Sequence, residues 1–189
     1  MQPQLNVSRE QWNDEFRTGR WDYLDSYLNE RARHAIIGTY CNALAPSGAI
    51  LDVGCGEGTL TDFLSANHKE RYLGIDISDE AVKKAVQKRD WKFTVTPIET
   101  FEHNQPFDII VCNEMLYYVD AKAVVEQLLT MLQPEGHLIF SLYHTEKVKL
   151  DEPILRFLDS TLVRKNTTKI IGDVDAEEVT WTVVAFTKR

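Results

Sequence analysis

Three glycines spaced two residues apart, Gly54, Gly56 and Gly58, follow an apolar run and precede a stretch of helical character. Glycine adopts backbone angles that other residues avoid, and it lets a ligand lie directly against the chain. A buried strand, a glycine-rich turn and a helix start together make the nucleotide-binding corner of a doubly wound α/β fold. Asp76 ends the next apolar run, twenty positions after Gly56, where an acid commonly meets ribose hydroxyls. These residues predict the binding of a nucleoside.

The same loop discriminates between nucleoside cofactors. The dinucleotide fingerprint G-x-G-x-x-G requires a third glycine at position 59, where this chain has Thr59. The carboxylates of Asp52 and Glu57 suit a cationic cofactor better than a dianionic pyrophosphate. A nicotinamide-dependent oxidoreductase is therefore the less favoured function. The purely structural alternative is that the glycines only form a tight turn and bind no ligand.

The segment LDVGCGEGTL at 51–60, followed by GIDIS at 74–78, resembles the cofactor signature of class I S-adenosylmethionine-dependent methyltransferases. The resemblance implies S-adenosyl-L-methionine as the cofactor. It also implies a Rossmann-like α/β fold, with a seven-stranded, mostly parallel sheet, a C-terminal antiparallel hairpin and helices on both faces. The implied activity is methyl transfer to a small-molecule acceptor, on nitrogen or on oxygen.

Ligands of such sheets lie beyond the carboxyl ends of the strands, so the candidate contacts should come from there. Many relatives carry an Asp at the position of Pro97, and its absence leaves the backbone of Ile98 and the carboxylate of Glu99 to meet adenine. Ile77 would offer an apolar face to the same ring. The expected cofactor contacts are Trp21, Arg33, Asp52, Gly54, Cys55, Gly56, Asp76, Ile77, Ile98, Glu99, Asn113 and Glu114.

Two further segments extend the resemblance. Residues 113–118 read NEMLYY and look like the N-E-x-L-Y-Y segment of nodulation-type N-methyltransferases and related small-molecule enzymes. There the Asn would face the amino group of the cofactor, and the Tyr pair would line the substrate pocket. Near the N-terminus, a W-D-Y segment at Trp21 precedes an expected helix that carries an E-x-x-R motif from Glu30 to Arg33. A guanidinium at that position suits the cofactor carboxylate, and an exposed arginine on a helix face is the alternative.

The chemistry follows from a sulfonium methyl donor. Methyl transfer is an in-line displacement, so the enzyme must chiefly align the reactants in a dry pocket. A general base is needed only if the nucleophile arrives protonated. His144 is the first candidate base, because histidine titrates near neutral pH and this one follows an expected strand. Tyr117, Glu114 and Tyr143 are the alternative catalytic residues, and a surface histidine without a catalytic role is the competing interpretation.

The elements that must position these residues alternate between strand and helix from residue 48 to 142, which requires a parallel sheet with right-handed crossovers. Beyond the first strand, strands are expected at 71–75, 91–96, 107–112 and 137–142, and helices at 8–16, 29–44, 59–66, 78–89 and 120–132. The tail should add a helix at 152–162 and strands at 169–173 and 179–187. The expected single domain, 1–189, consists of a helical lid (1–46), a cofactor-binding core (47–142) and a substrate-side helix with a closing hairpin (143–189).

Composition limits the partners. The chain has 189 residues and a formal charge of −8, with no basic cluster, which argues against a sequence-independent grip on nucleic acid. No apolar run reaches membrane-spanning length, and the polar N-terminus lacks a signal-peptide core. Three cysteines without C-x-x-C spacing favour reduced thiols. The histidines lack metal-ligand spacing, so no metal is predicted. We expect a cytoplasmic protein, monomeric or weakly dimeric, that binds no membrane.

The acceptor is only weakly constrained. The tyrosine pair and Trp21 could stack on a planar substrate or hold an amine by cation–π contact. The resemblance to N-methyltransferases favours an amine on a metabolite or sugar, and a hydroxyl of a natural product or quinone precursor is the second possibility. A regulatory or partner subunit that binds the cofactor without turnover is the alternative from another class.

Overall fold

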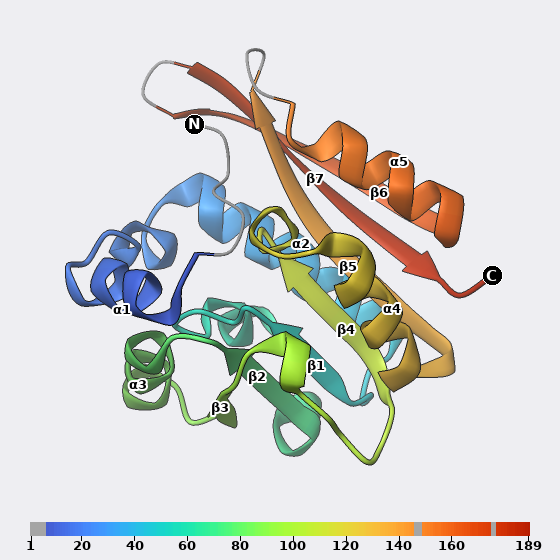
Figure 1. Ribbon diagram of the computed structural model, residues 1–189, viewed down its shortest axis with the longest axis horizontal. Coiled ribbons are helices and arrows are strands. Elements are labelled where there is room, and N and C mark those ends of the chain that lie inside the picture. The colour runs from blue at the N-terminus through green and yellow to red at the C-terminus, as the bar shows by residue number, and fades with distance from the viewer. Residues whose placement is uncertain (1–6, 146–148, 175–176) are drawn as a thin grey trace.

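The structure is a computed structural model that describes residues 7–145, 149–174 and 177–189. The strands among these residues form one seven-stranded sheet in the order β3-β2-β1-β4-β5-β7-β6 (Figure 1). Neighbours among β1 to β5 are parallel, whereas β7 runs antiparallel to both β5 and β6. The predicted sheet is confirmed. The strands are β1 (Ile50–Val53), β2 (Tyr72–Asp76), β3 (Phe93–Val95), β4 (Phe107–Asn113), β5 (Leu132–Thr145), β6 (Val163–Val174) and β7 (Glu177–Thr187).

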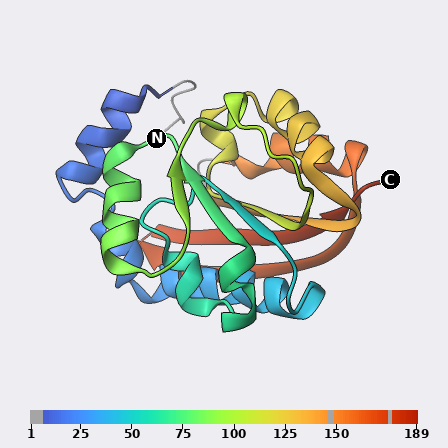
Figure 2. The ribbon, with the colours of Figure 1, turned by 90° about the horizontal axis from the view of Figure 1, so that it is seen from below.

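Helices cover both faces of this sheet (Figure 2). The α-helices are α1 (Arg9–Arg17), α2 (Leu28–Leu44), α3 (Asp79–Lys88), α4 (Ala121–Met131) and α5 (Asp151–Thr161). On one face α2 packs through Ile37 and Cys41, and on the other face α4 and α5 pack through Leu128 and Leu158. No helix in the described ranges is long and apolar enough to cross a membrane.

The central strand β4 shows why the sheet needs helices on both sides. Ile109 and Val111 belong to the core under α2, whereas Ile110 and Cys112 belong to the core under α4 and α5. Successive side chains of a strand point to opposite faces, so an uninterrupted apolar run fills both layers. Such a run is typical of a buried parallel strand.

Side-chain caps begin the helices α1, α3 and α4. Ser8 and Gln11 form a reciprocal capping box at the start of α1. Ser78 accepts a hydrogen bond from the Ala81 amide at 3.1 Å, which caps α3. Asp120 accepts from the amides of Lys122 and Ala123 at the start of α4. Each cap satisfies backbone donors that a helix N-terminus leaves unpaired.

One expected helix is wrong in type. In place of an α-helix at 59–66, the chain makes two short 3₁₀ helices, η2 (Thr59–Phe63) and η3 (Ala66–Arg71). The Thr61 hydroxyl donates to the Gly58 carbonyl at 2.8 Å, and Ser65 caps the second turn. Threonine and serine compete in this way with the helical backbone pattern, and the segment turns again before an α-helix is established.

Two strands are longer than expected. β5 begins at Leu132 rather than at residue 137, because residues 133–136 form an irregularity between the pairs Phe107↔Leu132 and Ile109↔His137. β6 begins at Val163 rather than at residue 169 and pairs with β7 along its length. Antiparallel pairing with the long strand β7 continues β5 through Thr145, beyond the end of β4.

Candidate active site

The glycine turn lies at the carboxyl end of β1. Gly54, Gly56 and Gly58 all have positive φ angles, of 70°, 54° and 80°. The amides of Gly54 and Cys55 both donate to the Ile75 carbonyl, at 2.8 and 3.0 Å, which fastens the turn to β2. A Cβ on Gly58 would lie 2.5 Å from Phe93 Cζ, whereas a Cβ on Gly56 would meet only Phe16, at 3.7 Å. Gly58 is therefore required for packing, and Gly56 keeps the backbone open beneath α1.

Asp76 shapes the same turn from the end of β2. Its Oδ2 accepts from the Gly56 amide at 2.9 Å, and its Oδ1 accepts from the Ser78 amide at 2.8 Å. Burial raises the pKa of Asp76, and these amide bonds oppose the rise. The carboxylate thus lies against the open glycine, with Ile77 half-buried beside it. The structure brings together the strand-end residues that the sequence predicts here.

Asp52 lies below this surface rather than on it. It is 2% exposed, and its Oδ2 accepts from the Tyr72 hydroxyl at 2.8 Å. Burial raises the pKa of Asp52 to about 7, and the nearby charge of Asp76 adds to the rise. The structure therefore gives Asp52 a supporting place in the core beneath the turn, and Cys55 is likewise buried.

A buried polar cluster lies at the end of β4. Arg33 is 2% exposed and donates to Glu30 and to Asn113. His34 contacts the same Asn113 through Nε2 at 3.0 Å, and burial together with the Arg33 charge lowers the pKa of His34 to about 3. Among the described residues, Arg33 Nε has no hydrogen-bond partner. Arg33 is thus a buried residue of the site rather than an exposed one on a helix face.

Glu114 completes this cluster in a strained conformation. Its φ of 58° is the one positive φ of a residue other than glycine among the described residues, and such angles gather at functional sites. Its Oε1 accepts from the Ser141 hydroxyl at 2.6 Å and lies 3.8 Å from Arg33 Nη1. Burial raises the pKa of Glu114, although the Arg33 charge opposes the rise. Glu30 and Glu114 place two carboxyl groups around one guanidinium.

Tyr117 connects Glu114 to β5. Its hydroxyl lies 3.3 Å from Glu114 Oε2 and 3.4 Å from the Tyr143 carbonyl oxygen, and it also accepts from the Tyr143 amide. The side chain is 5% exposed. The hydroxyl therefore satisfies a stretch of β5 backbone that extends past β4, so that Tyr117 supports the site more than it faces an acceptor.

Aromatic residues of the N-terminal segment cover the cluster. Trp12 packs edge-on against Tyr118 at 5.0 Å between ring centroids, and Trp21 lies 5.9 Å from Trp12. The Trp21 indole donates to Glu15 at 2.9 Å. Burial and the charge of Glu30 raise the pKa of Tyr23 to about 12. Trp12 is not among the residues predicted from the sequence, although its spacing of four from Phe16 on a helix indicates that the two side chains share a face.

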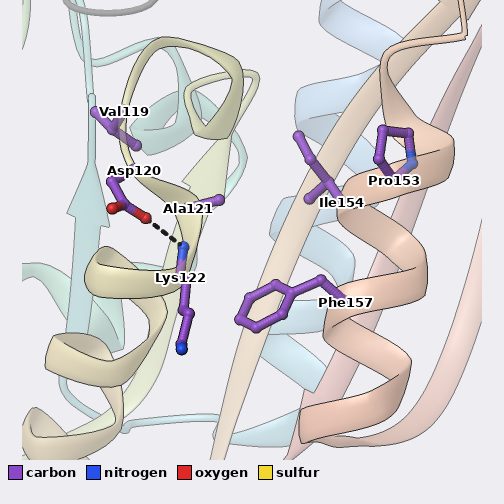
Figure 3. A pocket seen from close by; sticks show the side chains of 7 residues that line it. All are labelled: Val119, Asp120, Ala121, Lys122, Pro153, Ile154 and Phe157. Atoms are coloured by element: carbon purple, nitrogen blue, oxygen red, sulfur yellow. Dashed lines mark hydrogen bonds between the residues drawn. The ribbon is translucent and has the colours of Figure 1, made fainter.

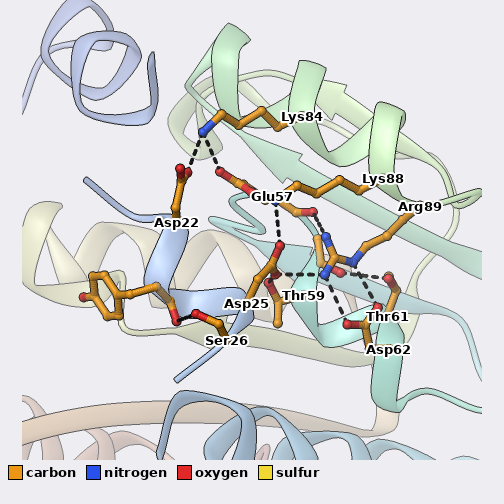
Figure 4. Close-up of polar contacts among 12 residues, drawn as sticks. Asp22, Asp25, Ser26, Glu57, Thr59, Thr61, Asp62, Lys84, Lys88 and Arg89 are labelled. Carbon is orange, nitrogen blue, oxygen red and sulfur yellow. Dashed lines mark hydrogen bonds and ion pairs between the residues drawn. The ribbon is translucent and has the colours of Figure 1, made fainter. Parts of the chain in front are cut away.

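Ion pairs fasten this segment to the glycine turn (Figure 4). We call the set the lid latch: Asp22 and Asp25 of the 3₁₀ helix η1 (Asp22–Asp25), Glu57 of the turn, and Lys84, Lys88 and Arg89 at the end of α3. Lys84 lies 2.7 Å from Asp22 and 3.0 Å from Glu57, and Lys88 contacts both Asp25 and Glu57. Arg89 lies 2.8 Å from Asp25. The charge of Glu57 is therefore already paired within the protein.

The contacts expected between adenine and the Ile98 backbone and the Glu99 carboxylate stay predictions. Ile98 is 5% exposed and its carbonyl accepts from Gln127 Nε2 at 2.7 Å, so its side chain belongs to the core. Glu99 is exposed in the 3₁₀ helix η4 (Ile98–Thr100).

His144 lies near the end of β5, and its Nδ1 is 2.8 Å from Asp151 Oδ2 on α5. A groove of about 460 Å³ lies between the starts of α4 and α5 (Figure 3). It is lined by Val119, Asp120, Ala121, Lys122, Pro153, Ile154 and Phe157. Asp151 was missed because nothing in the sequence pairs it with a strand residue.

Comparison with known proteins agrees with this geometry. The Methyltransferase domain family matches residues 44–182. The chain belongs to this family, and it is a class I S-adenosylmethionine-dependent methyltransferase of the small-molecule type.

Within the family it is similar to Nodulation protein S from Rhizobium tropici, with 31% identity over 169 residues, which cover 82% of this chain and 71% of that protein. The chain spans 57 to 60% of three further Nodulation S proteins. It is also 33% identical over 113 residues to a ubiquinone biosynthesis O-methyltransferase from Albidiferax ferrireducens, covering 54% of this chain and 44% of that one. The crystal structure of the N-methyltransferase NodS from Bradyrhizobium japonicum WM9 with S-adenosyl-l-homocysteine superposes with a TM-score of 0.75 at 23% identity, covering 93% of this chain and 97% of that one.

Proposed function

We propose that this enzyme methylates an amine on a small molecule, with Glu114 as the residue that receives the amine. The observation that carries the proposal is the cluster of Glu30, Arg33 and Glu114, in which two carboxyl groups share one guanidinium. Buried charges need partners. The surplus carboxyl group leaves room for one more cation, which a protonated amine supplies and a neutral phenol does not.

The residues of the turn fit the cofactor. Gly56 has open space above its Cα up to Phe16, so the backbone can touch a nucleoside. We assign the ribose hydroxyls to Asp76 and the cofactor carboxylate to Arg33, whose Nε is a buried donor without a partner in the described structure. S-adenosyl-L-methionine supplies an electrophilic methyl group on a positively charged sulfur. The protein residues bind it, hold the acceptor in line and exclude water.

The aromatic side chains of the N-terminal segment, together with Tyr118, would exclude water from the site. Trp12, Trp21 and Tyr118 pack against one another above the cluster, and the lid latch holds their segment against the turn. A pocket closed by aromatic rings also favours a cation, because ring faces attract positive charge. An amine that has entered as a cation must lose a proton before it can attack, and we assign that proton to His144.

The test is transfer of a labelled methyl group to a panel of matched amines and phenols. We expect turnover of amines, and expect Glu114→Gln to lower it strongly while S-adenosylhomocysteine binding persists. Asp76→Ala, as the control for the cofactor half, should lose binding and turnover together. Faster methylation of the phenols than of the amines would contradict the proposed acceptor and favour oxygen methylation, the activity named for the Albidiferax ferrireducens relative.

A further inference from the structure

The contact between His144 and Asp151 gives the proposed base a buried partner to which no role has yet been assigned. The two side chains meet through Nδ1 and Oδ2 at 2.8 Å. Asp151 is 4% exposed, and its second oxygen, Oδ1, is buried with no hydrogen-bond partner among the described residues. The His144 side chain keeps 23% of its surface exposed. Asp151 is thus buried away from solvent, while His144 reaches it.

The fold places this pair on the ligand side of the sheet. Ser141 lies opposite Asn113, the last residue of β4. His144 is three residues further along β5, about 10 Å beyond the end of β4 at the usual rise per strand residue. It is held there by β7, where it pairs with Thr180. The histidine therefore projects past the strand ends where cofactor and acceptor meet.

Asp151 is suited to hold the ring in one orientation. It is the first residue of α5, and the amides at a helix N-terminus favour a negative charge there. A buried carboxylate that accepts from Nδ1 fixes the proton on that nitrogen and leaves the lone pair of Nε2 directed outward. If Asp151 only anchored α5, a buried carboxyl with an unpaired oxygen would be a costly way to do so.

We propose that Asp151 is a positioning residue that holds His144 in the Nδ1–H tautomer, with Nε2 as the base that takes a proton from the acceptor. This inference rests on the proposed function for the identity of the acceptor, but not for the state of the ring. The proton moves from the acceptor nitrogen to Nε2. Its bonding pair stays on that nitrogen and would form the new bond to the methyl carbon, while the electron pair of the broken bond between that carbon and the sulfonium would remain on sulfur, which leaves as a neutral thioether. The imidazolium later returns the proton to water.

The neighbouring polar groups are consistent with this role. Tyr117 lies on η5 (Leu116–Tyr118), between Glu114 and the backbone of the residue before His144. Burial raises the pKa of Tyr117, and the charges of Glu114 and Asp151 add to the rise, so the phenol stays protonated. It therefore does not compete as a base. Lys149 pairs with Glu152 at 3.1 Å, away from the carboxylate of Asp151.

The test combines imidazole ¹⁵N NMR of the full chain with steady-state kinetics. His144→Gln identifies the ring signals by their loss. In the wild-type protein we expect the Nδ1–H tautomer, and in Asp151→Asn we expect the Nε2–H tautomer to gain population, because an amide can donate to Nδ1. Asp159→Asn is the matched control, since Asp159 lies on the same helix and pairs with Arg164 at an exposed position. It should leave the ring signals unchanged.

In turnover, His144→Gln should lower kcat about 100-fold, the usual range for a general base, and Asp151→Asn at least about 10-fold. KM and S-adenosylhomocysteine affinity should stay within about threefold, and the double variant should be no worse than His144→Gln alone. A wild-type ring in the Nε2–H form would overturn the inference whatever the acceptor. So would a kcat of Asp151→Asn equal to the wild type, or losses that multiply in the double variant. Absence of turnover on amines with the expected tautomer present would instead overturn the proposed function alone.

Discussion

The cofactor half and the acceptor half of this site are built in different ways. The cofactor half consists of backbone: positive-φ glycines, amides and one carboxylate, all within residues 54–78. The proposed acceptor half consists of side chains from the end of β4, from β5 and from α5, among them Glu114, His144 and Asp151. Arg33 of α2 lies between the halves, because it contacts Glu114 and is assigned to the cofactor carboxylate. A backbone site is specified by a short continuous segment, whereas a side-chain site is specified only by the finished fold. A substitution in one half should therefore impair the binding of its own ligand and leave the other half unchanged.

Substitution of Gly56 should produce the largest effect, and only in the cofactor half. In Gly56→Val the side chain would fill the space beside Phe16 and oppose the positive φ. We expect S-adenosylhomocysteine affinity to fall at least about 100-fold, with a melting temperature only a few degrees lower, since the strain costs about 1–2 kcal/mol. Calorimetry and thermal unfolding measure the two quantities.

Gly58→Ala is the matched comparison. Its Cβ would collide with the Phe93 ring at 2.5 Å, so here we expect the melting temperature to fall, by about 10 °C for some 3 kcal/mol in a chain of this size. Unimpaired affinity in Gly56→Val would mean that the nucleoside lies elsewhere.

A second prediction concerns pH and the core beneath the turn. The pKa of Asp52 is about 7 in the folded protein, against about 4 in the unfolded chain. Between pH 4 and pH 7, Asp52 therefore binds more protons in the folded state than in the unfolded state. Stability due to Asp52 is therefore fully present below pH 4 and is lost as pH rises towards 7, with a slope on the order of 1 kcal/mol per pH unit at most.

Asp52→Asn should remove this slope. Urea unfolding of both proteins from pH 4 to 8, without cofactor, measures the difference. Parallel curves for the two proteins would show that Asp52 is ionised in the folded state throughout, and that Tyr72 is sufficient to hold it charged.

Glu114→Gln should affect the acceptor half alone. Loss of a charge-assisted contact costs about 2 kcal/mol, so we expect kcat/KM for the amine to fall about 30-fold while cofactor affinity changes less than threefold. Glu102→Gln, at an exposed position outside the site, is the control. A parallel loss of S-adenosylhomocysteine binding would show that the two halves are not separable.

The smallest effect should come from the lid latch. Lys88→Gln removes contacts to Asp25 and Glu57, but its side chain is 41% exposed and solvent screens such pairs. We expect S-adenosylhomocysteine to dissociate about two- to fivefold faster, and the rate to depend less on salt than in the wild type. Stopped-flow displacement at 50 mM and 500 mM salt measures both.

Lys83→Gln, on the same helix and paired with Glu80 outside the latch, should behave like the wild type. An equal change in the two variants would mean that the net charge of α3 matters rather than the latch.

The same contrast explains what the sequence could predict. The glycine turn, Asp76 and the caps at Ser8 and Ser78 depend on residues a few positions apart, and a reader of the sequence can recognise them. The parallel part of the sheet could be predicted because apolar runs alternating with helices allow few topologies. The helix expected at 59–66 failed because hydroxyl side chains compete with the helical pattern locally, and propensity alone does not settle that competition.

For the proposed acceptor half, the sequence offers candidate residues but not their contacts. Glu114 and His144 were named from strand ends, yet their partners Ser141 and Asp151 are fixed only by strand register and by the docking of α5. Glu57 illustrates the same limit in the other half. It reads as a free carboxylate beside a cation site, and in the fold two lysines of α3 already neutralise it.

The hydroxyl of Tyr117 has one more consequence, for association between molecules. β5 continues beyond its neighbour β4, and a bare N–H and C=O on such an overhang can template pairing with a foreign chain. The phenol oxygen meets both groups of Tyr143, as a neighbouring strand would. A single side-chain atom thereby occupies the two backbone groups of Tyr143 that a foreign strand would need for pairing.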